Sequence, residues 1–254
     1  MRRLLPLLLL LCSLPLHAAE TEGYRETLRA LDAVRGADPV QAGELQLLPL
    51  ADGAWLHRSY LEINGVRMHA NGVLHVHEQG ITVIDTPWTV QASRDLLAFL
   101  QREYPGRPLR LIVSHAHDDA IGGIEVFSDA GAAIYANAKT AELARRQGIR
   151  APQWLITESF TLPGGIEVFH PGAAHSADNI VVWLKASRIL YAGDVARSRN
   201  ADSLGNLADA DRAAWPASLR AVMQRYPDAE IVVPGHGLHG GQELLVNTLR
   251  LLER

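Results

Sequence analysis

Four apolar segments of this sequence each lead into a short stretch that carries histidine or aspartate at the point where a strand should end. The clearest is Leu109 to Val113, which runs into His115-Ala116-His117-Asp118-Asp119. Because alternate residues of an extended segment point the same way, we expect His115, His117 and Asp119 to project together. Imidazole and carboxylate are ligands that zinc takes in proteins. The segment therefore predicts a metal site at the edge of a sheet.

Three later segments repeat this arrangement beside glycine or proline. They are Pro171 to Asn179, which contains His175; Leu190 to Asp194, which ends in Asp194; and Pro234 to Gly237, which contains His236. Glycine lets the backbone come close to a bound ion, because it has no side chain to clear. One such segment alone is consistent with a solvated polar loop. Four in succession favour a shared metal centre.

Strand-like and helix-like segments alternate in both halves of the chain, and no long linker separates the halves. This pattern favours one layered α/β domain with two sheets over two separate domains. Helices are predicted over residues 90–104, 121–127, 140–147, 213–226 and 243–252, and strands over residues 54–57, 73–77, 81–84, 109–113, 132–136, 156–162, 166–169, 180–184, 189–191 and 231–233.

The N-terminus has the composition of a secretory signal peptide. Arg2 and Arg3 precede the apolar stretch Leu4 to Leu16, and His17-Ala18-Ala19 supplies small residues for cleavage. Lipid attachment at Cys12, the only cysteine, is disfavoured because Leu11 stands where a small residue is required. We therefore expect a signal peptide over residues 1–19, an N-terminal extension over 20–46 and the folded domain over 47–254.

Charge and hydropathy narrow the range of partners. The formal net charge is −4 and no basic run stands out, so a nucleic-acid partner is not expected. No segment after the signal reaches membrane-spanning length, so we expect no membrane association after cleavage. The chain is expected to be exported to the periplasm and to act there as a monomer.

The ligand segments and the stretches between them resemble the metallo-β-lactamase superfamily. More narrowly, they are similar to the class B β-lactamases of the dizinc subclass that includes the Verona integron-borne enzymes. This resemblance implies a four-layer αββα sandwich with two zinc ions at one edge between the sheets. It covers about Leu48 to Leu252 and includes Ala51 to Trp55, Asp85 to Trp88, His115 to Gly123, Pro171 to Val182, Gly205 to Asp211 and Pro234 to Gly241.

The resemblance also implies an activity, the zinc-dependent hydrolysis of the β-lactam amide bond that confers antibiotic resistance. The nucleophile would be a water or hydroxide between the metals, oriented by Asp119. The Asn206 amide would donate to the oxyanion. Arg197 would hold the substrate carboxylate, unless it is an ordinary surface arginine. The implied ligands are His115, His117 and His175 for the first zinc, and Asp119, Asp194 and His236 for the second.

Other residues have supporting roles in this interpretation. Asp85 is expected to hold a metal ligand or its loop, and Trp88 to form a wall or part of the core. The segment Tyr60 to Met68 resembles a mobile flap over the substrate. An ordinary hairpin that turns at Asn64-Gly65 fits the same pattern.

Two positions depart from the subclass. Asp194 stands where these enzymes usually carry cysteine, and Ala120 stands where they usually carry arginine. An aspartate at the first position is the habit of the wider superfamily, which includes thioester hydrolases. Hydrolysis of another ester, a thioester or a lactone therefore remains an alternative. A zinc-binding or scaffold protein without turnover is a third possibility, which the complete set of six ligand positions disfavours.

Overall fold

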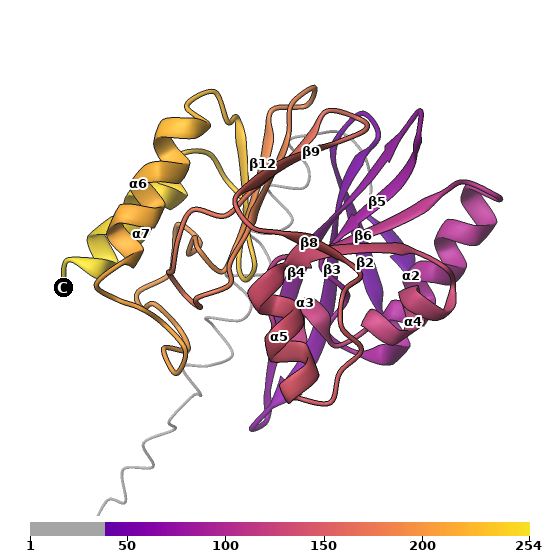
Figure 1. The fold of residues 1–254 in the computed structure, drawn as a ribbon, viewed down its shortest axis with the longest axis horizontal. Helices are drawn as coiled ribbons and strands as arrows, with labels where there is room; N and C mark the ends of the chain where they lie inside the picture. Colours follow the sequence, from indigo (N-terminus) through magenta and orange to yellow (C-terminus); the bar gives the residue numbers. More distant parts are fainter. Residues whose placement is uncertain (1–38) are drawn as a thin grey trace, which may run out of the picture.

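The computed structural model describes residues 39–254, in which two β-sheets pack face to face between two layers of helices (Figure 1). Eight strands form the first sheet in chain order, and five form the second in the order β13-β12-β11-β10-β9. The predicted αββα sandwich is therefore confirmed. The signal peptide predicted over residues 1–19, and the extension as far as residue 38, lie outside the described residues.

The bounds of the elements follow the chain. The first sheet comprises β1 (Val40–Ala42), β2 (Leu45–Ala51), β3 (Ala54–Ile63), β4 (Val66–His77), β5 (Gly80–Ile84), β6 (Leu109–Val113), β7 (Ala133–Asn137) and β8 (Trp154–Ile156). The second comprises β9 (Ser159–Leu162), β10 (Ile166–Phe169), β11 (Val181–Leu184), β12 (Ile189–Gly193) and β13 (Ile231–Pro234). The helices are α2 (Val90–Glu103), α3 (Asp118–Ile121), α4 (Ile124–Asp129), α5 (Ala138–Arg146), α6 (Trp215–Arg225) and α7 (Glu243–Leu252).

Strand β6 shows why the layers form. Leu111 and Val113 pack in the core beneath α2 and α4, whereas Ile112 packs in the core between the two sheets. Successive side chains of a strand point to opposite faces, so the part of β6 that is covered on both faces, Leu111 to Val113, is continuously apolar. A third core, around Trp215 and Leu244, fills the space between the second sheet and helices α6 and α7.

The strand directions bring the predicted ligand segments to one edge. Strands β5, β6, β7 and β8 are parallel, and so are β12 and β13. The loops after β6, β12 and β13 carry His115, Asp194 and His236 respectively, and the connection from β10 to β11 carries His175. The carboxyl ends of strands in both sheets therefore build one site.

The helix predicted over residues 121–127 is divided between α3 and α4, which Gly122 and Gly123 separate. Two features of the first sheet also differ from the sequence-based expectations. The segment predicted as one strand over residues 156–162 forms two strands that belong to different sheets. Strand β8 pairs with β7 in the first sheet, and β9 pairs with β10 in the second. A continuous β-type sequence cannot show such a change of sheet. The folded domain was expected to begin at residue 47, but the first sheet already begins at Val40, because β1 pairs with β2. Strand β1 is mostly exposed and so lacks an apolar pattern.

Candidate metal centre

The segment after β6 brings its three candidate ligands together, by a route that differs partly from the prediction. His117 is extended and precedes α3, and the rings of His115 and His117 lie 4.6 Å apart between their centroids. Asp119 belongs to the first turn of α3 rather than to the extended segment. The helix turn places its Oδ1 3.8 Å from His115 Nε2. The alternation argument therefore explains the two histidines, and the turn of α3 explains Asp119.

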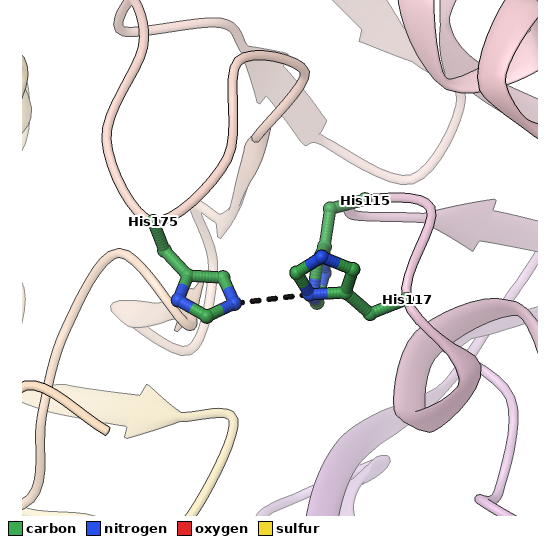
Figure 2. Close-up of side chains that lie close together, drawn as sticks. All are labelled: His115, His117 and His175. Carbon is green, nitrogen blue, oxygen red and sulfur yellow. Dashed lines mark hydrogen bonds between the residues drawn. The ribbon is translucent and has the colours of Figure 1, made fainter. Parts of the chain in front are cut away.

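His175 completes a group of three imidazoles. Figure 2 shows it reaching from the opposite loop toward His115 and His117. Its Nε2 lies 3.0 Å from His117 Nδ1, and its ring is nearly perpendicular to both other rings. One nitrogen from each of the three residues lies within 4.8 Å of the others. Three imidazoles converging in this way form a face that suits a tetrahedral zinc ion.

Asp119, Asp194 and His236 form a second group beside the first. His236 Nε2 is 3.0 Å from Asp119 Oδ2 and 3.5 Å from Asp194 Oδ2. Asp194 Oδ2 is also 3.3 Å from His175 Nε2, so the two groups adjoin. Burial alone would lower the pKa of His236, but Asp194 and Asp119 outweigh it and hold this pKa well above its usual range. A positive charge between two carboxylates this close, of which Asp194 is buried, relieves their mutual repulsion.

Buried atoms without partners show that the residues fit a metal ion. Within residues 39–254, His115 Nε2 and Asp194 Oδ1 are buried and make no hydrogen bond. The groups His115–His117–His175 and His115–Asp119–Asp194 each have the spacing of a metal site. Gly235 lies against Asp194, where a Cβ atom would be 2.0 Å from Oδ1. The donor set consists of nitrogen and oxygen atoms and includes no thiolate. A borderline cation such as zinc accepts a set of this kind.

Asp85 is connected to His115, a candidate ligand, through Ser114. The Asp85 carboxylate accepts from the backbone N–H and the hydroxyl of Ser114, both at 2.6 Å, and from the Tyr191 hydroxyl at 2.5 Å. Ser114 Oγ lies 3.0 Å from His115 Nδ1. Because the serine proton is used by Asp85, we assign the proton of His115 to Nδ1, which leaves Nε2 as the lone-pair nitrogen.

The backbone of Asp85 is unusual, and its carboxyl group is fully buried. Its φ of 59° lies in the left-handed region, which few residues other than glycine adopt, although aspartate does so more often than most. Burial raises the pKa of Asp85 to about 7, although His115, Ser114 and Tyr191 oppose this shift. The strained residue is thus held by the bonds it makes next to His115.

Two further residues that contact this site had no role in the sequence analysis. Asp209 accepts a hydrogen bond of 3.0 Å from His117 Nε2, which leaves His117 Nδ1 free to face His175. Asn71 lies within β4 and bonds to the loop that carries His236. Neither contact has a local sequence signal, since both join segments far apart in the chain.

An open cavity of about 580 Å³ lies over the two groups. Trp88 forms part of its wall, with its ring 5.4 Å from that of His236. The β3–β4 hairpin contributes Leu61 and Met68, and the opposite side contributes Arg197 and Asn206. The candidate substrate-binding residues therefore face the same space as the candidate ligands.

Arg197 and Asn206 lie on neighbouring loops. The guanidinium of Arg197 packs beneath Gly205, where a Cβ atom would lie 3.0 Å from Nη1. Asn206 Oδ1 accepts from Ala208 N at 3.0 Å, so the oxygen of the amide is occupied and its N–H groups remain as donors. The hairpin predicted at Asn64-Gly65 is present, and Val66 and Met68 on its second strand are exposed.

Known proteins match this chain over most of its length. The profile of the metallo-beta-lactamase superfamily matches residues 65–236. A metallo-beta-lactamase type 2 from Bacillus sp. (strain 170) is 32% identical over 240 residues, which is 92% of this chain and 93% of that protein.

Solved structures agree with these sequence matches. The structure of TMB-1 has a TM-score of 0.78 and 35% identity, and the match covers 82% of this chain and 97% of TMB-1. A metallo-beta-lactamase from Erythrobacter litoralis has a TM-score of 0.80 and 32% identity over 85% of this chain and 99% of its own. The chain therefore belongs to the metallo-β-lactamase superfamily, on the class B branch that these relatives represent.

Proposed function

We propose that this protein hydrolyses the amide bond of β-lactam antibiotics with two bound zinc ions. The observation that carries the proposal is the convergence of six ligand-type side chains beneath one open cavity. Its relatives are named as metallo-beta-lactamases, and they match this chain over most of its length. His115, His117 and His175 hold the first zinc, and Asp119, Asp194 and His236 hold the second.

The chemistry divides between the metals and the side chains around them. Bound zinc lowers the pKa of water toward neutrality and polarises a carbonyl group. Asp119 accepts a hydrogen bond from the attacking water and so orients it. Asn206 donates its amide N–H to the oxygen on which negative charge develops. Arg197 forms a two-pronged ion pair with the carboxylate that β-lactams carry.

Hydrolysis of another ester, a thioester or a lactone is the second candidate. The observation that favours it is Asp194, because a carboxylate rather than a thiolate stands at the second group. The open cavity and its mixed wall would admit substrates of several shapes. The two candidates share the metal site and differ in the substrate.

A direct test uses purified protein beginning at residue 20 and loaded with zinc. It is assayed on a penicillin, a cephalosporin and a carbapenem, and in parallel on panels of thioesters and lactones. We expect turnover of the β-lactams and about two zinc equivalents per chain by elemental analysis. His117→Ala should abolish turnover. His77→Ala should not, because His77 is the last residue of β4, at the end of the strand away from Met68 and the cavity. Turnover of thioesters or lactones alone would overturn the proposal in favour of the second candidate.

We also propose that the protein is exported, loses residues 1–19 and acts in the periplasm as a monomer. The charged and apolar N-terminal segment supports this proposal. Among the described residues, no helix is long and apolar enough to span a bilayer. Cell fractionation, sequencing of the mature N-terminus and light scattering would test the location, the cleavage site and the oligomeric state. Retention of residues 1–19 on the purified protein would contradict this interpretation.

A further inference from the structure

Arg58 is a charged side chain buried in the middle of β3. It is only 1% exposed, and its Nη2 makes no hydrogen bond. Within residues 39–254, the single hydrogen bond of its guanidinium is the one that Nε donates to Asn71 Oδ1 at 3.2 Å, and it makes no ion pair with a carboxylate. Burying a charge without an opposite charge is unfavourable. The presence of this buried, unpaired guanidinium therefore indicates that Arg58 has a role beyond packing.

Asn71, the partner of Arg58, bonds to the loop that follows β13. Its Nδ2 donates to Pro234 O at 3.0 Å and to Gly237 O at 2.8 Å. Its backbone N–H donates to Gly235 O at 2.7 Å. A guanidinium can only donate, so the amide oxygen must face Arg58 and the amide nitrogen must face the loop. Arg58 and the two carbonyl groups therefore favour the same orientation of the Asn71 amide, and Arg58 anchors the end of the amide that faces away from residues 234–237.

This loop positions two members of the second ligand group. It carries His236, whose Nδ1 donates to His69 O at 2.7 Å. It also carries Gly235, which packs directly against Asp194 Oδ1. A shift of the loop would move His236 and open a gap beside Asp194. His115, His117 and His175 come from other loops and would not move with it.

We propose that Arg58 is a positioning residue for the second metal site and acts through Asn71 on the loop that carries His236. This inference rests on the proposed binding of two zinc ions. Within residues 39–254, no hydrogen bond or ion pair joins Arg58 to a candidate metal ligand. Its effect on metal binding should therefore be selective for the second equivalent.

The test is a zinc titration of metal-free protein in competition with a chromogenic chelator, for the wild type, Arg58→Met and Arg58→Lys. Partners behind metal ligands typically contribute about 10- to 100-fold in affinity. We expect Arg58→Met to weaken the second equivalent by a factor in this range and to leave the first unchanged. Arg58→Lys should recover part of the loss, because its ammonium group can still donate to Asn71. Equal weakening of both equivalents, or of neither, would overturn the inference.

Two further variants separate this role from general stability. Leu100→Ala creates a cavity in α2, away from the loop, and should lower the unfolding temperature without changing the ratio of the two zinc affinities. If Arg58→Met does not fold, Asn71→Asp keeps an acceptor for Arg58 but removes the donor to Pro234 and Gly237. It should weaken the second equivalent alone, and an unchanged ratio would contradict the proposal.

The β-lactam hydrolysis of the wild type is measured in parallel. Its absence would overturn the proposed function, while the zinc titration would still decide the role of Arg58. A wild type that binds a single zinc would overturn the inference about Arg58 itself.

Discussion

Replacement of Asp85 by asparagine tests the chain of hydrogen bonds behind His115. The backbone N–H of Ser114 cannot reverse its direction, so the oxygen of the new amide must stay opposite it. The amide nitrogen then faces the hydroxyls of Ser114 and Tyr191. Tyr191 can donate instead to Asn71 O at 2.9 Å. The remaining partner for the Ser114 proton is His115 Nδ1 at 3.0 Å, which would become an acceptor.

The consequence is a proton on His115 Nε2, the nitrogen that faces the metal site. Partners that set the protonated nitrogen of a ligating histidine typically contribute about 10- to 100-fold in metal affinity, or about 1.4–2.8 kcal/mol. We expect Asp85→Asn to weaken the first zinc equivalent by this amount. The metal-free fold should not be destabilised, because burial raises the pKa of Asp85 to about 7 and the neutral amide avoids a buried charge.

The assay is a zinc competition titration combined with urea unfolding of the metal-free protein. Ser114→Ala serves as the matched variant, because it removes the middle member of the chain. In the Ser114→Ala background, Asp85→Asn should cause little further loss of affinity, since the connection is already broken. An unchanged affinity in the single variant, or fully additive losses in the double variant, would refute the reasoning.

Four other outcomes can be measured with the same protein. Asp194→Cys should tighten the second zinc equivalent and make hydrolysis depend less on buffered free zinc, because thiolate is the softer donor; coincident rate curves would argue against this. Arg197→Ala should raise KM for several β-lactams more than it lowers kcat, since the contact exists in ground and transition states alike. Asn206→Ala should instead lower kcat, by up to about a hundredfold, and a change confined to KM would contradict its role. Burial lowers the pKa of His57 to about 4, so its neutral ring stabilises the fold above pH 6.5. This stability, about 3 kcal/mol, should be lost as the pH falls toward 4, and urea unfolding of metal-free His57→Gln should show a weaker pH dependence than the wild type.

Apolar periodicity predicted helices α2, α5, α6 and α7 to within two residues at each end, but not the division of the segment 118–129 into α3 and α4. Strand-end chemistry pointed to the six ligand-type residues that the fold brings together. These signals are local, since a strand such as β6 and the residues that follow it are adjacent in sequence. The residues behind the ligands have no such signal. Asp209 reaches His117 across 92 positions of sequence, and Asn71 reaches Pro234 across 163. Their roles follow from how the loops pack, which the sequence pattern does not encode.

The roles of histidines outside the motifs also could not be predicted from the sequence pattern. His57 and His69 belong to none of the four ligand segments. His57 is buried, and its Nε2 lies 3.2 and 3.1 Å from Ile84 O and Asp85 O. His69 accepts from Gly237 N at 3.0 Å. Both hold backbone next to the site, and only the folded structure distinguishes this role from simple packing.

Asp194 also changes how the centre responds to oxidants. A thiolate at a metal site is open to oxidation and alkylation, and the first irreversible oxidation step destroys it as a ligand. Residues 20–254 contain no cysteine, and the ligand-type residues of the centre are imidazoles and carboxylates. Peroxide or a thiol-reactive inhibitor therefore has no thiolate to attack among these ligand-type residues, although the thioether of Met68 lies in the cavity wall. A carboxylate in this position is a harder donor than a thiolate, but it is not oxidised. The ligand-type residues of the centre are therefore the same under reducing and oxidising conditions.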